Sequence, residues 1–194
     1  VDVFYSKNFI NKWPNPILKP EHESYESPER LKAIMTYFNS VDFFKEDDVR
    51  IRDPSMATEE DVRRVHEAYL VELVQNISDF GAGKIGYGVK GFPGIYDLAR
   101  LSAGCVKDML KSLTYEGSTG VDNYCGLSCN RLPGHHAGKT TSEGLCVFNN
   151  ISIGVEYLRE KCNFNGNIAI IDIDAHFGNG SSSLYYKDPN VMHV

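Results

Sequence analysis

Two periodicities run through the sequence, and together they predict an α/β domain. Apolar residues that recur every three or four positions predict amphipathic helices within residues 31–38, 62–73, 95–113 and 151–159. Short runs rich in β-branched residues predict strands near residues 1–5, 49–51, 124–130 and 166–176. Because the last helix lies between two predicted strands, we expect a β-α-β unit, which implies a parallel sheet covered by helices.

Local signals mark the helix starts and the loops. Ser27 precedes a proline, and Thr58 precedes three acidic residues, which are patterns typical of helix N-termini. Residues 8–20 carry three prolines, so we expect an irregular surface loop. Residues 78–92 hold five glycines without a phosphate-loop signature, so a mobile surface loop is expected. His66 lies among apolar positions and is expected to be a hydrogen-bonded core residue.

The run after residue 170 places polar groups at the end of an apolar strand. Asp172, Asp174 and His176 alternate with apolar residues, so a strand would direct all three to one face at its carboxyl end. Open α/β sheets bind ligands at that end. Buried carboxylates need charge compensation, and aspartate oxygen and histidine nitrogen are ordinary zinc ligands. The pattern therefore predicts a metal site; the alternative is that the aspartates only cap the next loop.

A pair of histidines precedes this run in the sequence. His135 and His136 follow Pro-Gly, and on a loop both rings can point the same way. A neutral imidazole that titrates near pH 7 suits a general base acting on water, and a second imidazole can stabilise developing charge. The alternative is a solvent-exposed pair without function. The β-α-β unit places the histidine loop and the Asp-x-Asp-x-His run at one end of the sheet, which favours a shared site.

Composition and charge narrow the class of protein. The 194 residues are 42% hydrophobic and 24% charged, as expected for a globular chain with its own core. A net charge of −6 without a Lys/Arg run argues against direct nucleic-acid binding. Neither a membrane span of ~20 apolar residues nor a secretory signal is found, so no membrane association is expected. Five cysteines at scattered spacings fit reduced thiols inside the cell.

The two ends of the sequence suggest an excerpt. Val1 stands where an initiator Met would be, and residues 190–194 resemble a strand interrupted midway. We therefore expect one domain over residues 1–194 that is truncated at its C-terminal end.

Three sequence blocks resemble the signatures of the zinc-dependent histone deacetylases. They are Arg-Leu-Pro-Gly-His-His-Ala at 131–137, Gly-Leu-Cys-Val-Phe-Asn-Asn at 144–150 and Asp-Ile-Asp-Ala-His-Phe-Gly-Asn-Gly at 172–180. This superfamily also includes the acetylpolyamine amidohydrolases and the acetoin-utilisation proteins. Fainter matches at 27–30 and 56–70 extend the resemblance over nearly the whole chain. It implies an arginase/deacetylase-like three-layer α-β-α fold with a mostly parallel sheet, incomplete here because only about the N-terminal half of the catalytic domain is present.

The resemblance implies two bound cations. A catalytic Zn²⁺, or Fe²⁺ in its place, would be held by Asp174 and His176. Asp172 would help to hold a structural K⁺ or Na⁺ beneath the site. The family's third zinc ligand, an Asp, and its transition-state Tyr or His lie beyond Val194.

The resemblance also implies roles in catalysis and substrate binding. His136 would be the general base and then the general acid, with Asn179 as its orienting partner. His135, oriented by Asp172, would be an electrostatic helper. The remaining assignments are Gly144 and Leu145 for the wall of the substrate tunnel and Arg30 for an internal channel that releases acetate.

Several positions depart from the family pattern. Leu145 stands where the family usually has a Phe, and Phe177 stands where it has a second His. The loop at 85–92 has no acid to grip the substrate backbone.

The expected function is removal of acetyl groups from acetyl-lysine in histones or other proteins, in the nucleus or cytoplasm, with the oligomeric state left open. The alternatives are a catalytically inactive interaction module with this fold and a deacetylase of small acetylated amines such as acetylpolyamines.

Overall fold

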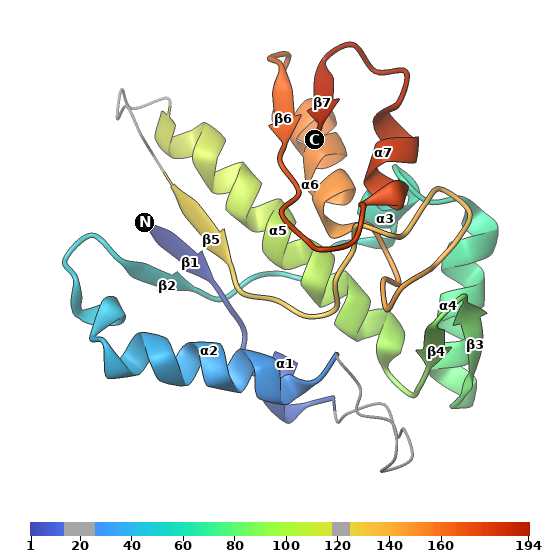
Figure 1. Cartoon of the computed structure of the whole chain (residues 1–194), viewed down its shortest axis with the longest axis horizontal. Coiled ribbons are helices and arrows are strands. Elements are labelled where there is room, and N and C mark those ends of the chain that lie inside the picture. The colour runs from blue at the N-terminus through green and yellow to red at the C-terminus, as the bar shows by residue number, and fades with distance from the viewer. Residues whose placement is uncertain (14–25, 118–124) are drawn as a thin grey trace.

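A computed structural model describes residues 1–13, 26–117 and 125–194 (Figure 1). The helices are α1 (Asn8–Asn11), α2 (Pro28–Ser40), α3 (Glu59–Arg63), α4 (Ala68–Phe80), α5 (Ile95–Gly117), α6 (Asn150–Lys161) and α7 (Asn179–Tyr185), with a 3-10 turn η1 (Phe43–Lys45). The strands are β1 (Asp2–Phe4), β2 (Arg50–Arg52), β3 (Gly83–Gly86), β4 (Val89–Gly91), β5 (Gly126–Ser128), β6 (Ile168–Ile170) and β7 (Val191–His193).

The strands outside the β3–β4 hairpin run parallel to their neighbours. One sheet has the order β2-β1-β5, with Val3 opposite Ile51 and Leu127. A second parallel pair joins β6 to β7, so the predicted β5-α6-β6 unit spans two sheets. In Figure 1, α5 crosses the centre, with β2, β1 and β5 on one side and α6, β6 and β7 on the other. The prediction of an α/β fold with mostly parallel strands is confirmed.

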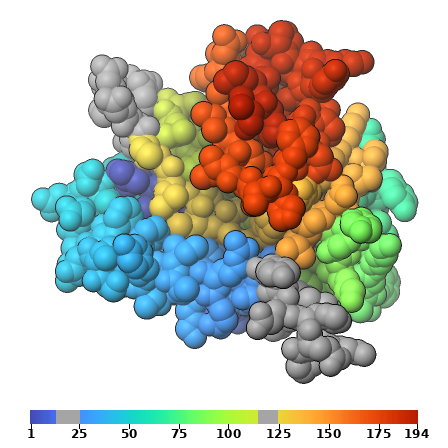
Figure 2. Space-filling model, viewed as in Figure 1, coloured from blue at the N-terminus to red at the C-terminus, as the bar shows by residue number. Residues whose placement is uncertain are grey.

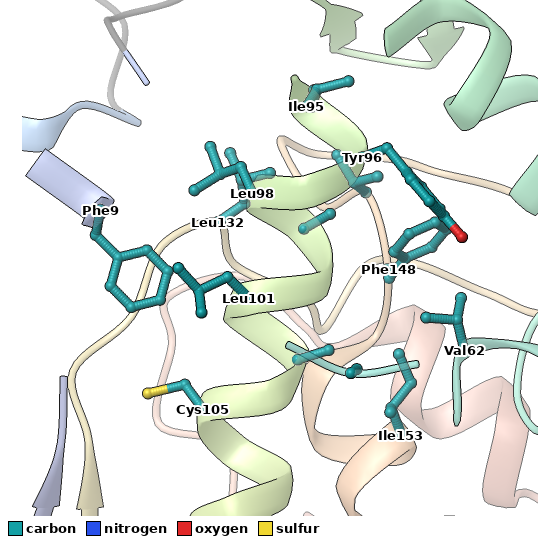
Figure 3. Close-up of a cluster of buried hydrophobic side chains, with 14 of the residues drawn as sticks. Phe9, Val62, Ile95, Tyr96, Leu98, Leu101, Cys105, Leu132, Phe148 and Ile153 are labelled. Carbon is teal, nitrogen blue, oxygen red and sulfur yellow. The ribbon is translucent and has the colours of Figure 1, made fainter. Parts of the chain in front are cut away.

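Helix α5 organises the core because both of its sides are apolar. It packs against β1, β5 and α6, and its residues Leu98, Leu101 and Cys105 are at most 3% exposed. Figure 3 shows Leu101 directed toward Phe9. Gly104 permits a close approach of the backbone, since a Cβ there would lie 1.9 Å from the carbonyl oxygen of Ser55.

Helix N-termini follow the predicted signals in part. Thr58 forms a capping box with Asp61, because its hydroxyl accepts from the Asp61 amide and the Asp61 carboxylate accepts from the Thr58 amide. Ser27 occupies the N-cap position of α2 without a side-chain cap hydrogen bond. The helix predicted across His66 is interrupted there, with α3 ending at Arg63 and α4 beginning at Ala68.

Two predicted loops are partly regular structure. Within residues 8–20, α1 forms and buries Phe9, and Trp13 is 3% exposed; residues 14–25 lie outside the described residues. The prediction of an irregular surface loop is therefore wrong for residues 8–13. The glycine-rich segment contains the β3–β4 hairpin, in which Ile85 and Val89 are buried. Apolar residues between the glycines give the hairpin a buried face, which the prediction of a mobile loop overlooked.

None of the helices in the described part of the chain combines the length and the apolar composition needed to cross a membrane.

Candidate active site

The loop between β5 and α6 is held by a buried histidine. His66 is 2% exposed, and its Nδ1 lies 2.9 Å from the carbonyl oxygen of Gly138 while its Nε2 accepts from the Asn149 amide at 2.9 Å. Burial lowers the pKa of His66 to about 4, so the ring is neutral near pH 7. The predicted role of His66 as a hydrogen-bonded core residue is confirmed.

Asparagine side chains hold both ends of the same loop. Asn149 caps α6 by accepting from the Ser152 amide, and its Nδ2 donates to the carbonyl of Ala137. Asn150 donates to the carbonyl of Leu132 at 2.8 Å. These bonds fix the loop on either side of the two histidines, so their positions are set by buried structure.

The two histidines lie side by side and each contacts a different partner. Their ring centroids are 4.0 Å apart. The Nδ1 atom of His135 lies 2.8 Å from an Asp172 carboxylate oxygen, and the Nδ1 atom of His136 lies 2.5 Å from Asn179 Oδ1. Since a carbonyl oxygen only accepts, the Asn179 contact requires a proton on His136 Nδ1 and leaves its Nε2 free to accept one. The structure thus places both histidines against the partners predicted for them.

The Asp-x-Asp-x-His run differs from its predicted form. Strand β6 ends at Ile170, so Asp172, Asp174 and His176 lie on the loop that follows it and do not share a strand face. The strand is also only half-buried, and Ile173 on the loop is 94% exposed. Alternation could not predict this because two hydrogen bonds turn the loop: the Asp174 amide donates to Asp172, and the His176 amide donates to Asp174.

The two carboxylates remain ionised near neutral pH. Burial raises the pKa of Asp172, but hydrogen bonds from the His135 ring and the Asp174 amide outweigh it, so the pKa lies below its ordinary value. Hydrogen bonds from the amide and ring of His176 lower the pKa of Asp174. Both residues therefore supply negative charge at the end of β6.

Asp174 and His176 present two adjacent donor atoms to a metal. Asp174 Oδ1 lies 3.1 Å from His176 Nδ1, and the His176 ring centroid is 5.9 Å from that of His136. An ionised carboxylate beside an imidazole nitrogen fits the donor chemistry of Zn²⁺. No group of three or more His, Cys, Asp or Glu side chains in the described part of the chain is arranged to hold a metal. The pair fits as part of a zinc ligand set, and a complete set requires a further ligand.

The predicted tunnel residues adjoin the histidines. Gly144 has φ +54°, and a Cβ there would lie 2.3 Å from a carbon of the His136 ring, so glycine is needed for the ring to occupy this position. Leu145 also lies in the left-handed region, with φ +68°. It is half-buried and lines a cavity of about 550 Å³ beneath the β3–β4 hairpin.

Arg30 and His135 line one cavity of about 530 Å³, together with Asp172 and the residues of β6. Arg30 is exposed on α2, close to its N-terminus. The structure thus brings Arg30 to the same cavity as His135 and Asp172, whereas Leu145 lines the other cavity and Gly144 lies against His136.

Three residues at the site were missed in the sequence. Arg131 and Glu26 form a buried ion pair with two hydrogen bonds of 2.7 and 3.0 Å, which holds the start of the histidine loop. The side chain of His193 is 6% exposed and its Nε2 lies 4.0 Å from Asp172. Val191 and His193 share one face of β7, because side chains two residues apart on a strand point the same way. This alternation is the sequence signal that could have identified His193.

In this α/β domain, two histidines and an Asp-x-Asp-x-His loop meet beyond the ends of parallel strands. A model of the histone deacetylase domain matches residues 24–194. The chain belongs to the histone deacetylase family.

Its relatives include deacetylases and amidohydrolases from distant organisms. A histone deacetylase-like amidohydrolase of Pseudomonas aeruginosa is 31% identical over 186 residues, which is 95% of this chain and 46% of that protein. A probable deacetylase of Methanothermobacter thermautotrophicus is 33% identical over 174 residues, which is 89% of this chain and 49% of that protein. The chain spans about half the length of these relatives.

A solved structure shows the same fold. The crystal structure of the HDA15 HD domain superposes with a TM-score of 0.85 at 23% identity, covering 99% of this chain and 52% of that one. The match supports the fold, which the sequence blocks had implied.

Proposed function

We propose that the full-length protein is a metal-dependent amidohydrolase that removes acetyl groups from acetyl-lysine side chains of histones or other proteins. The observation that supports this most directly is the pairing of His136 with Asn179 and of His135 with Asp172, beside the donor atoms of Asp174 and His176. These contacts support a different proposed task for each histidine.

Asp174 and His176 would hold the metal, with a further ligand from outside the described residues. A bound Zn²⁺ supplies Lewis-acid polarisation of the amide carbonyl and lowers the pKa of water, and Fe²⁺ could serve in its place. Asp172 is the residue proposed to help bind a monovalent cation, K⁺ or Na⁺, because its carboxylate is ionised and partly buried.

His136 is the proposed general base. Asn179 accepts from its Nδ1, so its Nε2 takes a proton from the attacking water and later delivers one to the leaving lysine amine. The ring can occupy this position because Gly144 has no side chain that would clash with it. His135 is positioned by an ionised Asp172, and its proposed task is to stabilise the negative charge that develops on the substrate.

Arg30 is the proposed site of acetate release. Its guanidinium lines the cavity that also contains His135, and a carboxylate product would be attracted to it. Gly144 and Leu145 are proposed as the tunnel wall along the lysine side chain. We propose a location in the nucleus or cytoplasm, without direct binding to nucleic acid or membrane.

A second candidate function is an inactive interaction module. It is favoured by the exposure of the candidate metal ligands, 51% for the Asp174 side chain and 78% for that of His176. Hydrolysis of small acetylated amines is the third.

Turnover by the full-length protein separates these candidates. The purified protein is loaded with Zn²⁺ or Fe²⁺ and given an acetyl-lysine peptide or an acetylpolyamine, and acetate release is measured. Release from the peptide supports the proposal, and release from the polyamine alone supports the amine hydrolase. No release from either, with metal bound in stoichiometric amount, supports the inactive module.

A further inference from the structure

The β3–β4 hairpin presents two lysines directly opposite each other. Lys84 pairs with Lys90 across the hairpin, and both side chains are exposed. Like charges at directly opposed positions destabilise an antiparallel pair. Neither ammonium group forms an ion pair with any residue that the structure describes, so the repulsion is not compensated within this part of the chain. An anion bound between the two lysines would compensate it.

The same lysines line an apolar cavity. Lys84, Lys90 and Leu145 all contribute to the 550 Å³ cavity, whose walls include Ile95 and Val147. Among the lining residues that the structure describes, the one carboxylate is that of Glu26, and it is paired with the buried Arg131 guanidinium. The cavity therefore joins an apolar interior to a cationic edge, which is the chemistry that accepts an apolar side chain next to a carboxylate.

The hairpin is connected to the candidate active site through its tip. The Gly144 amide donates to the carbonyl of Tyr87 at 3.0 Å, and a Cβ on Gly86 would overlap the carbonyl oxygen of Ser142. The adjoining Glu143 accepts from Asn179, whose Oδ1 contacts His136. A substrate that reaches His136 along Gly144 and Leu145 therefore passes the cavity edge that carries the two lysines.

We infer that the cavity under the β3–β4 hairpin selects acetyl-lysine substrates in which an apolar residue and an acidic residue flank the acetyl-lysine. The apolar side chain enters the cavity and the carboxylate lies between Lys84 and Lys90. The inference rests on the proposed deacetylase activity and adds the class of substrate to it. By the same charges, a basic histone tail or a polycationic amine is disfavoured at this edge.

The test compares four peptides with the full-length protein. In each peptide the acetyl-lysine is flanked by two residues, which are Leu and Asp, Leu and Asn, Leu and Lys, or Ser and Asp. The value of kcat/KM is measured at 50 and 200 mM salt. These concentrations lie on either side of 0.1 M, where the Debye screening length is about 10 Å. We expect Leu-Asp to exceed Leu-Lys by about tenfold at low salt, the size expected for two exposed ion pairs. The preference should shrink at the higher salt concentration, and Ser-Asp should fall below Leu-Asp because the cavity stays unfilled.

Variants test whether the two lysines cause the preference. In the double variant Lys84→Gln/Lys90→Gln, the ratio of Leu-Asp to Leu-Lys should fall to near one, while turnover of acetyl-lysine amide without flanking residues stays unchanged. The matched control is Lys7→Gln/Lys187→Gln, which removes the same charge from two exposed lysines that line neither cavity. Equal kcat/KM for acidic and basic peptides, or an equal loss of preference in the control, would overturn the inference.

A failure of the proposed deacetylase activity has a different signature. If no peptide is hydrolysed, binding of the fluorescein-labelled peptides is measured by anisotropy. Tighter binding of Leu-Asp than of Leu-Lys by the wild type, lost in the lysine variant, supports the inference without the activity. Equal binding of the two peptides rejects it.

Discussion

The two loops that form the candidate active site differ in how firmly the chain holds them. Residues 131–150, the histidine loop, are fixed by His66, Asn149 and a buried Arg131–Glu26 pair. Residues 171–178, the aspartate loop, project from β6 with Ile171 71% and Ile173 94% exposed. In Figure 2 the orange-to-red C-terminal segment lies at the surface of this face. The candidate proton-handling residues are thus held by buried contacts, whereas the candidate metal ligands depend on short contacts within their own loop.

The difference has a physical origin. A buried loop must satisfy its backbone groups within the protein, and the histidine loop does so with side chains from α5, α6 and the segment before α4. The aspartate loop is solvated, so few such bonds are required.

The largest effect is expected at the metal ligands. Asp174→Ala in the full-length protein should abolish metal binding and activity together, because His176 alone provides one donor from this loop. Metal content measured by mass spectrometry and acetate release test this. The matched variant Asp47→Ala, which removes a carboxylate far from the site in the sequence, should keep both. Stoichiometric metal in Asp174→Ala would contradict the assignment.

Substitutions in the histidine loop should reduce activity to a smaller extent and should leave the metal bound. His136→Ala should lower kcat by ~10²–10⁴-fold, the usual contribution of general acid–base catalysis, while the metal stays bound. His135→Ala should lower kcat by a smaller factor, because the proposed task of His135 is electrostatic. Single-turnover rates and metal content, measured on the same preparations, distinguish the two loops. A greater loss at His135 would exchange the two roles.

The support of the histidine loop should also appear as a pH dependence of stability. The pKa of His66 is lowered to about 4 in the folded protein, so the unfolded chain binds a proton at a higher pH than the folded one. The stability contributed by neutral His66 is complete above about pH 6.5 and is lost progressively as the pH falls toward 4. Its size is roughly 3 kcal/mol at most, by the conversion of 1.36 kcal/mol per pKa unit.

Urea unfolding between pH 7 and 5 measures this loss. The variant His66→Gln should be less stable at pH 7 but should have a flatter pH dependence over the same range. An identical slope in the two proteins would show that other groups cause the acid sensitivity.

The sequence predicted the two loops better than it predicted their surroundings. Adjacent blocks such as Asp172 to His176 carry their chemistry in local spacing, and the contact of His135 with Asp172 was implied by the resemblance to the histone deacetylases. The exit of the chain from β6 after Ile170 depends on bonds that the carboxylates make to their own backbone, which periodicity does not encode. The burial of Phe9 and the hairpin were likewise hidden, because prolines and glycines outweighed a few apolar residues.

The smallest expected effect gives the most direct test of the contrast between the loops. Ile153 lies in α6, directly after the histidine loop, and is fully buried in the core shown in Figure 3, whereas Ile173 is 94% exposed on the aspartate loop. Ile153→Ala should cost about 2–5 kcal/mol of unfolding free energy, from lost burial and a residual cavity. Ile173→Ala should cost less than about 0.5 kcal/mol, because its side chain is solvated in both states. Both values come from urea unfolding under one condition. A cost above about 2 kcal/mol at Ile173 would mean that this side chain packs in the folded protein, and the aspartate loop would then be as firmly held as the histidine loop.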